Sequence, residues 1–315
     1  MPIPTLAEWL EEWSASRRHH LEASSVASYR IMADAYLLPH LGDVPLDALD
    51  VRRIEATYAT LLTRGGRGGR PLAPRTVAYA HAVLHRALVD AVRLGVLATN
   101  PAAAVTLPRH AVDGRPPRRL RVWDARQVGQ FLVASADHPL ADLWAVALGT
   151  GLRRGELLGL RRRDVDVEAA RLTVAVAVAE VDGAVQLKRP KTGRTRTVSL
   201  DDHTLGHLDE RLRSSASAGA DAPVFADATG GHLRPRRISD IWRAYVRTLP
   251  LPPIRLHDLR HTHATLLLAA GVPVKVVSER LGHTKIAMTL DVYAHVLPAM
   301  DRDAADRFGQ LLSGD

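Results

Sequence analysis

Four short stretches of the sequence carry side chains that could act together on one phosphate group. They supply two arginines, two histidines, a lysine and a tyrosine: Arg153, Arg260, His257, His283, Lys191 and Tyr293. Guanidinium groups stay charged and bind phosphate oxygens with paired hydrogen bonds. A tyrosine can attack phosphorus as a nucleophile, and a lysine, unlike an arginine, can give a proton to a leaving oxygen. The set fits phosphodiester chemistry that uses neither a metal nor another cofactor.

Each of these residues, taken alone, also has an ordinary structural explanation. Arg153 could belong to a basic surface, His257 could cap a helix or lie in a core, and Tyr293 could be a half-buried core residue. Short motifs often match by chance. The weight of the interpretation therefore lies on the combination of residues and not on any one of them.

The basic charge of the chain comes almost entirely from arginine. Lys+Arg is 42 and Asp+Glu is 34, which gives a formal net charge of +8. Only four of these cations are lysines, at positions 188, 191, 275 and 285. Because nearly all cations of this chain are arginines, a lysine is expected where the chemistry needs an ammonium group. Lys191 is the preferred candidate for a proton donor, and Lys188 is the alternative. The charge surplus predicts a polyanionic partner.

Length and composition exclude several classes of protein. The 315 residues correspond to about two domains of ordinary size. The absence of cysteine rules out disulfides, thiolate zinc sites and a cysteine nucleophile. No apolar run approaches the roughly 18 residues that span a bilayer, and no export signal is visible at the start. We therefore expect a globular protein of the cytoplasm with no membrane partner.

Residues 1–108 are expected to form a helical bundle. Thr5 and Glu8 have the spacing of a capping box, which predicts a first helix directly after them. Further amphipathic helices are predicted over 25–38, ending before Pro39, over 51–62 and over 74–97. Helices joined by short loops form a small bundle.

The second part of the chain is predicted to be mostly helical with a small inserted β-sheet. Residues 109–123 are basic and rich in proline, which predicts a linker between a first domain, 1–108, and a larger domain, 124–315. The alternation over 172–178 predicts a strand. The segments 185–188 and 195–200 predict a β-hairpin with Lys191 at its tip. The fold class is thus mostly α with a small β-sheet (α+β).

The order of these motifs resembles that of the tyrosine recombinases, the phage integrase family. Its members have a T-G-x-R-x-x-E stretch, a lysine in a β-hairpin, H-x-x-R, Gly-His, and a tyrosine about ten residues later. The matching positions here are Arg153 with Glu156, Lys191, His257 with Arg260, His283 and Tyr293. The resemblance implies a helical core-binding (SAM-like) domain at 1–108 and a catalytic domain at 124–315. No arm-binding module precedes the bundle, so regulation through arm-type sites is not expected.

The resemblance implies a site-specific DNA recombinase that cleaves and rejoins double-stranded DNA through a 3′-phosphotyrosine, without ATP. Tyr293 would attack the scissile phosphate while Arg153 and Arg260 hold its non-bridging oxygens. His257 would assist removal of the tyrosine proton, and Lys191 would protonate the leaving 5′ oxygen.

Two further residues complete the implied site. His283 would hydrogen-bond the phosphate, and Glu156 would orient the arginine side of the site. Additional arginines are candidates for contacts with the DNA backbone or bases. They are Arg75, Arg86, Arg93, Arg109, Arg118 and Arg119.

The resemblance also implies an assembly of four protomers on two recombination sites, passing through a four-way junction. In solution, away from DNA, the chain is expected to be a monomer. Its expected location is the cytoplasm, in association with the nucleoid or other DNA, and a directionality factor is a further candidate partner. The tail carries an apolar stripe that could pack on its own domain or dock into a neighbouring protomer. The stripe consists of Ala304, Ala305, Phe308, Leu311 and Leu312.

Three alternatives stay open at the level of sequence. A type IB topoisomerase would use the same chemistry on one DNA strand. A zinc-dependent hydrolase could use His257 and His261, which have the i, i+4 spacing of a zinc pair, although Arg260 would put a cation beside the metal. A DNA-binding protein without catalysis would keep the fold but would not need the full residue set.

Overall fold

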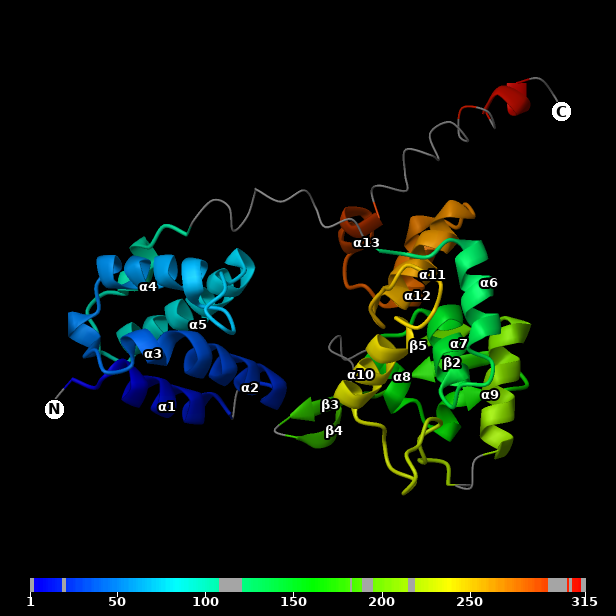
Figure 1. The fold of residues 1–315 in the computed structure, drawn as a ribbon, viewed down its shortest axis with the longest axis horizontal. Helices are drawn as coiled ribbons and strands as arrows, with labels where there is room; N and C mark the ends of the chain where they lie inside the picture. Colours follow the sequence, from blue (N-terminus) through cyan, green and yellow to red (C-terminus); the bar gives the residue numbers. More distant parts are fainter. Residues whose placement is uncertain are drawn as a thin grey trace. The chain divides into compact units, whose positions relative to one another are not determined.

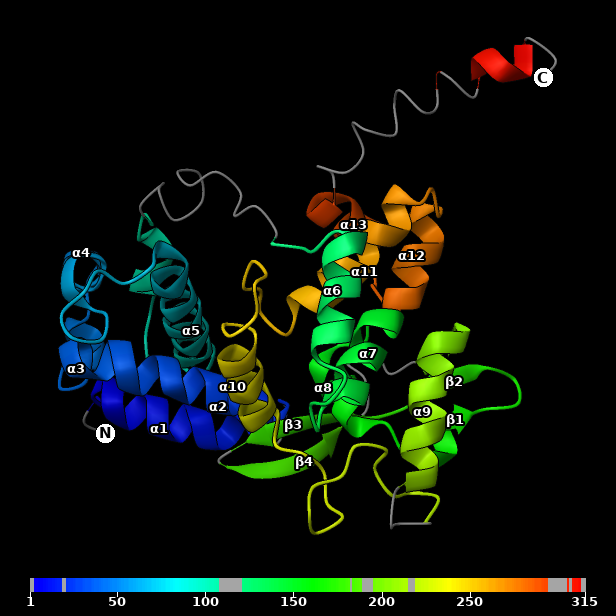
Figure 2. The same ribbon diagram turned by 45° about the vertical axis from the view of Figure 1, so that its right-hand side comes forward.

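The structure, a computed structural model, consists of two compact units, residues 1–119 and 120–315. Figures 1 and 2 show the helices and strands of each unit. The structure describes residues 3–18, 21–107, 121–181, 183–188, 195–214, 219–293, 305 and 308–312. Within these ranges, none of the helices combines the length and the apolar character that crossing a membrane requires.

The N-terminal unit is a bundle of α-helices. Its α-helices are α1 (Leu6–Arg17), α2 (Ala23–Met32), α3 (Leu38–Leu41), α4 (Val51–Arg64) and α5 (Pro74–Arg93). The predicted capping box opens α1: the Glu8 backbone N–H donates to Thr5 Oγ1 at 3.3 Å, and the Thr5 N–H donates to Glu8 Oε2 at 2.8 Å. Two orphan donors of the first turn are satisfied in this way.

Two predicted helix ends in this unit were wrong. The second helical path does not stop before Pro39, because a π-helical turn at Ala33–Leu37 leads into α3, which has the proline in its first turn. Proline is tolerated there because a first-turn N–H needs no helical acceptor. The long helix α5 ends at Arg93 and not at Leu97, because Gly95, at φ +74°, closes it in a Schellman turn.

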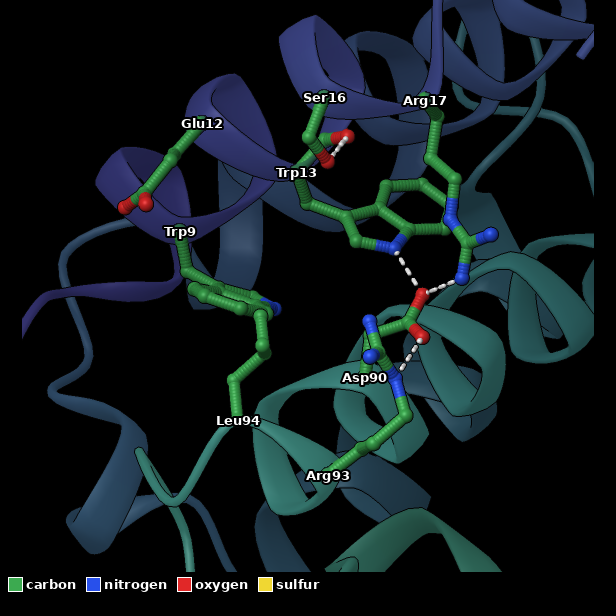
Figure 3. A pocket seen from close by; sticks show the side chains of 8 residues that line it. All are labelled: Trp9, Glu12, Trp13, Ser16, Arg17, Asp90, Arg93 and Leu94. Carbon is green, nitrogen blue, oxygen red and sulfur yellow. Dashed lines mark hydrogen bonds and ion pairs between the residues drawn. The ribbon is translucent and has the colours of Figure 1, made fainter. Parts of the chain in front are cut away.

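A buried carboxylate ties α1 to α5 in the N-terminal unit. Asp90 Oδ2 accepts hydrogen bonds from Trp13 Nε1 at 2.6 Å and from Arg17, and Arg93 Nε lies 3.4 Å from Oδ1 (Figure 3). Burial alone would raise the pKa of Asp90, but the bonds from Arg17 and Trp13 outweigh it and lower the pKa. These groups line a cavity of about 460 Å³.

The C-terminal unit has one large apolar core and a second, smaller apolar cluster within residues 264–281. Its helices are α6 (Ala125–Ala134), α7 (Ala141–Thr150), α8 (Arg154–Gly159), α9 (Asp202–Ser214), α10 (Pro235–Tyr245), α11 (Asp258–Ala269), α12 (Val274–Leu281) and α13 (Ile286–Tyr293). An aromatic cluster of Trp123, Phe131, Trp144 and Trp242 lies at the centre of the core. Trp123 ends the predicted linker, yet it is fully buried, and its Nε1 donates to the Pro252 carbonyl at 2.9 Å.

Among the described residues, two small antiparallel sheets accompany these helices, so the prediction of a mostly helical fold with little β-structure is confirmed. One sheet has the order β1 (Val165–Asp166), β2 (Arg171–Val174), β5 (Arg196–Ser199). The other pairs β3 (Ala177–Val181) with β4 (Ala184–Lys188), beside α8 and α10 (Figure 2).

The predicted hairpin around Lys191 was wrong in its pairing. The strand β4 pairs with β3, and β5 pairs with β2, so these two segments do not form a hairpin with one another. The strand β3 instead forms a hairpin with β4, in which Val181 lies opposite Ala184 and Gly183, just before β4, has φ +76°. The sequence between these two strands reads Asp-Gly, which is a strong signal for a tight hairpin. Lys191 itself lies outside the described residues.

Candidate active site

The candidate site is built on the C-terminal ends of two helices. The helix α7 ends at Gly151 with φ +64°, and α12 ends at Gly282 with φ +67°. A helix end leaves carbonyl groups without helical partners and carries partial negative charge. A Cβ atom on Gly151 would lie 2.7 Å from His263 Cδ2, and one on Gly282 would lie 2.9 Å from the Arg196 guanidinium. Both positions thus need glycine for backbone conformation and for space.

Arg260 joins the two helix ends. It comes from the first turn of α11 and is only 3% exposed. Its Nη1 donates to the Gly151 carbonyl, and its Nη2 donates to the Leu281 carbonyl, each at 2.7 Å. The two carbonyls fix the place of the guanidinium, and each brings only the partial negative charge of a backbone dipole.

Arg153 reaches the same end of α12 from another direction. It directly precedes α8, and its Nη2 donates to the Gly282 carbonyl at 3.1 Å while its Nη1 donates to Glu156 Oε1 at 2.9 Å. Its side chain is 40% exposed, so it faces solvent more openly than Arg260 does. The structure therefore brings together the two arginines that the sequence places 107 residues apart.

Glu156 is the carboxylate that organises this side of the site. It is 4% exposed and accepts bonds from the Arg153 N–H at 2.9 Å and from Arg196 Nη2 at 2.7 Å. Burial acts to raise the pKa of Glu156, but the hydrogen bonds and charge of Arg196, followed by those of Arg153, lower it to about 2. Glu156 therefore stays ionised at neutral pH and holds the side chains of Arg153 and Arg196 in place.

Two histidines of the site are neutral at pH 7. His257 directly precedes α11 and has its ring edge-on to His261, with centroids 5.0 Å apart. His257 is exposed, but the part of its ring that faces the protein is shielded from water. This desolvation, followed by the charges of His261 and Arg260, lowers the pKa of His257 to about 4. A neutral imidazole in this place is able to accept a proton.

His283 follows Gly282 and lies within reach of the same arginines. Its Nδ1 is 2.7 Å from Thr289 Oγ1, which belongs to α13 and is fully buried. Desolvation, then the charges of Arg260 and Arg153, lower the pKa of His283 to about 4. The hydrogen bond to Thr289 fixes the ring and ties α13 to the end of α12.

Two more arginines of the site were not predicted from the sequence. Arg196 of β5 donates to Glu156, and its Nε donates to the Arg280 carbonyl at 3.0 Å. Arg280, in the last turn of α12, donates to three different elements. The only local signal for Arg280 is its place directly before Leu281, Gly282 and His283, and no local pattern indicates Arg196.

Comparison with known proteins identifies the family. Residues 121–300 match the model of the phage integrase family, and residues 5–62 match the N-terminal SAM-like domain of phage integrases. The chain belongs to the phage integrase family. The family resemblance predicted from the motif order is thereby confirmed.

Curated relatives in the family include recombinases and integrases. The chain is 30% identical over 246 residues to a tyrosine recombinase XerC-like protein of Caldanaerobacter subterraneus, covering 70% of this chain and 62% of the relative. It is 29% identical over 211 residues to the ICEBs1 integrase of Bacillus subtilis, covering 62% and 56%. It is 24% identical over 313 residues to the putative prophage phiRv2 integrase of Mycobacterium tuberculosis, covering 98% and 79%. The chain thus spans less than two thirds of the length of the first two.

Solved structures of integrases share the fold. The Tn1549 transposon integrase in complex with a circular intermediate DNA has a TM-score of 0.79 at 20% identity, covering 95% of this chain and 99% of that chain. The lambda integrase tetramer bound to a Holliday junction has a TM-score of 0.68 at 19% identity, covering 89% and 78%.

Part of the site predicted from the sequence lies outside the described residues. Lys191, Arg109, Arg118 and Arg119 are not described. Tyr293 is the last residue of α13, which packs beside α12 (Figure 1), and the structure describes its backbone but not its side chain. Within the part of the chain that is described, no group of three or more His, Cys, Asp or Glu side chains is placed to hold a metal ion.

The remaining DNA-contact candidates lie in the N-terminal unit. Arg75, Arg86 and Arg93 are 11 and 7 residues apart on α5, and both spacings are close to whole helical turns. The three side chains therefore share one face of α5, and all three residues are exposed. Arg86 Nη1 contacts the Tyr29 hydroxyl at 3.4 Å, and Arg93 borders the cavity beside Asp90 (Figure 3).

Proposed function

We propose that this integrase is a site-specific DNA recombinase, which cleaves and rejoins double-stranded DNA through a 3′-phosphotyrosine without a metal or ATP. The proposal depends on one observation: Arg153 and Arg260 donate to neighbouring carbonyls at the end of α12. Both arginines are close enough to His283 for their charges to lower its pKa. A phosphoryl transition state carries negative charge on its non-bridging oxygens, and two cations fixed beside those oxygens stabilise it.

The proposed reaction begins at Tyr293. Its oxygen forms a bond to the scissile phosphorus while its proton passes to His257, whose neutral ring is ready to accept it. The bond from phosphorus to the 5′ oxygen breaks, and Lys191 gives that oxygen a proton. Arg153 and Arg260 balance the charge on the non-bridging oxygens. The phosphodiester energy is kept in the tyrosyl ester, and a partner 5′-hydroxyl reverses the steps to rejoin the strands.

Preorganisation is the contribution of the surrounding fold to this reaction. Arg260 is fixed by two carbonyls, and Arg153 is fixed by Glu156 and a third carbonyl, so neither needs to reorganise when the phosphate charge develops. His283, held by Thr289, would donate a hydrogen bond to the phosphate. Glu156 would orient the arginines and not contact DNA.

DNA binding is proposed to use both units. Residues 1–108 would act as the core-binding domain, with the exposed arginine face of α5 on the DNA, and 109–123 would link it to the catalytic domain at 124–315. Arg109, Arg118 and Arg119 of the linker would contact phosphates. Affinity should fall steeply with salt because each phosphate contact releases counterions. Such a protein would work in the cytoplasm on nucleoid DNA.

Assembly is proposed to follow the related integrases. The lambda integrase structure is a tetramer on a Holliday junction, and we propose four protomers on two sites for this chain, with monomers away from DNA and a directionality factor as a further partner. Phe308, Leu311 and Leu312 of the tail are 63%, 79% and 74% exposed. These apolar side chains suit docking on a neighbouring protomer, which we prefer to packing on their own unit.

The alternatives differ in ways that a simple assay separates. A type IB topoisomerase would relax supercoiled DNA without exchanging strands between two sites. A zinc hydrolase that used His257 and His261 would lose activity in excess chelator. A DNA-binding protein without catalysis would form no covalent adduct. Membership of the phage integrase family and the surrounding arginines favour the recombinase.

The deciding experiment traps the covalent intermediate. The protein is incubated with a pool of genomic fragments that includes the DNA flanking its gene, in excess chelator, and is then denatured in detergent. We expect a protein–DNA adduct with a free 5′-hydroxyl end for the wild type and for Tyr245→Phe, and none for Tyr293→Phe, which should still bind DNA. Tyr245 is the matched control because its hydroxyl only donates to the Ala134 carbonyl. An adduct from Tyr293→Phe, or none from the wild type, would overturn the proposal.

A further inference from the structure

The side chain of Arg280 connects four elements of the C-terminal unit. Arg280 belongs to the last turn of α12, and its Nε donates to His263 Nε2 in α11 at 3.0 Å. Its Nη1 donates to the Ser199 carbonyl at the end of β5 at 3.0 Å, and its Nη2 donates to the Gly149 carbonyl in α7 at 2.9 Å. All three acceptors are uncharged, so the three bonds fix geometry without an ion pair among them.

The backbone that carries Arg280 is also the support of the candidate site. The carbonyls of three consecutive residues, 280, 281 and 282, accept from three different arginines. The first accepts from Arg196, the second from Arg260 and the third from Arg153. We call residues 280–282 the carbonyl shelf. Any movement of the shelf displaces both arginines that are proposed to hold the phosphate.

We propose that Arg280 is a positioning residue that sets the carbonyl shelf, and through it Arg153 and Arg260, at the distance that strand cleavage requires. The inference rests on the function proposed above and deepens it. Arg280 does not contact the phosphate in this proposal. It acts by fastening the end of α12 to α7, α11 and β5, so that the acceptors of Arg260, one on α7 and one on α12, keep a fixed separation.

Only arginine has the donor geometry for this task. Its planar guanidinium presents donors in several directions at once, whereas a lysine ammonium is a compact point charge on a flexible stem. His263 is 8% exposed and accepts at Nε2, so its ring is neutral and its other nitrogen carries the proton. Burial, then the charge of Arg280, lower the pKa of His263 to about 4, which keeps this acceptor available at neutral pH.

The matched variants are Arg280→Gln, Arg280→Lys and Lys275→Gln. Lys275 is an exposed cation on the same helix, so its variant removes one positive charge from α12 without touching the shelf. The probe is the duplex around the cleavage position mapped in the genomic pool. We expect single-turnover adduct formation by Arg280→Gln to fall about 100-fold, the loss that a misplacement of about 1 Å can cause. The dissociation constant for the duplex should change less than about threefold, and Lys275→Gln should match the wild type in cleavage.

Arg280→Lys provides the rescue. It keeps the charge and some donors, so its cleavage rate should lie between those of the wild type and Arg280→Gln. In addition, Arg280→Gln and Arg153→Lys should be non-additive, because both act through the same contact with the shelf. Additive losses, or equal losses in DNA affinity and in cleavage rate, would contradict a positioning role and indicate general destabilisation.

A second measurement needs no cleavage at all. The ring of His283 is titrated by NMR in the wild type, Arg280→Gln and Lys275→Gln, with His283→Gln used to assign the signal. If the shelf moves, Arg260 and Arg153 leave His283, and its pKa rises in Arg280→Gln alone. An unchanged His283 titration together with wild-type cleavage would overturn the inference. If the wild type forms no adduct, the proposed function fails, and the titration still decides whether Arg280 sets the shelf.

Discussion

Arg17 in the N-terminal unit and Arg260 in the C-terminal unit are held in different ways. In the N-terminal unit Arg17 is paired with the buried carboxylate of Asp90, so its positive charge is offset where it lies. In the C-terminal unit Arg260 is held by the carbonyls of Gly151 and Leu281. Backbone dipoles fix a cation with only partial negative charge. The ion pair of Arg17 stabilises the fold, and the two carbonyl contacts of Arg260 fix the place of a guanidinium that is proposed to bind an anion.

Removing the carbonyl-held arginine gives the largest expected effect on the reaction. Arg260→Gln should lower the rate of adduct formation by about 10²–10³-fold, as the loss of one fixed transition-state donor does. Single-turnover cleavage on the mapped duplex measures this rate.

The matched variant is Arg17→Gln in the N-terminal unit. It should leave the cleavage rate nearly unchanged and lower the free energy of unfolding of that unit by about 1–2 kcal/mol, because Asp90 loses a donor. Equal effects of the two variants on cleavage would remove the distinction between the two kinds of arginine.

The second prediction concerns the end of α12. Gly282→Ala should cost about 1 kcal/mol for the left-handed backbone and should also slow cleavage about tenfold or more, because its Cβ would lie 2.9 Å from the Arg196 guanidinium. Gly230 is the control, since it has φ +83° but no atom within 4 Å of an added Cβ. Gly230→Ala should be less stable than the wild type but should cleave DNA at the same rate. Thermal melts and cleavage rates of both variants separate backbone strain from displacement of the site.

The residues that sequence reasoning found are those with local signals. Arg153 and His257 were found from short motifs, and each directly precedes a helix in the structure. Gly151, from the same motif as Arg153, ends α7 with φ +64°. Capping, turn and periodicity signals act over a few residues, so they can be read without knowing the rest of the fold.

The residues that were missed depend on contacts between distant parts of the chain. Arg280 meets Ser199 and Gly149, which are 81 and 131 residues away in sequence. Arg196 reaches Glu156 only because β5 pairs with β2 and not with β4. Strand pairing is set by long-range packing, which a pattern of alternation does not specify. The same limit explains the wrong hairpin around Lys191.

The third prediction compares two buried carboxylates, Glu156 of the C-terminal unit and Asp90 of the N-terminal unit. The pKa of Glu156 is lowered from 4.5 to about 2, so its stabilising contribution is complete above about pH 4.5 and is lost as the pH falls toward 2. In Glu156→Gln, the free energy of unfolding of the C-terminal unit should therefore fall less steeply as the pH is lowered. Urea unfolding between pH 5 and 3 measures this dependence.

Cleavage distinguishes Glu156 from its counterpart. At neutral pH Glu156→Gln should slow adduct formation about tenfold through poorer orientation of Arg153. Asp90→Asn should affect only the stability of the N-terminal unit. If Asp90→Asn slowed cleavage as much as Glu156→Gln does, Glu156 would have no special role in orienting the site.

The smallest effect on the reaction itself is expected at the exposed face of α5. Arg86 has only a 3.4 Å contact to the Tyr29 hydroxyl, so no fixed geometry would be lost in Arg86→Gln. If Arg86 contacts a phosphate, the slope of log affinity against log salt should become shallower by about 0.9, the value for one released contact on duplex DNA. Cleavage at saturating DNA should stay the same. Anisotropy titrations at several salt concentrations give the slope, and an unchanged slope would place the DNA away from this face of α5.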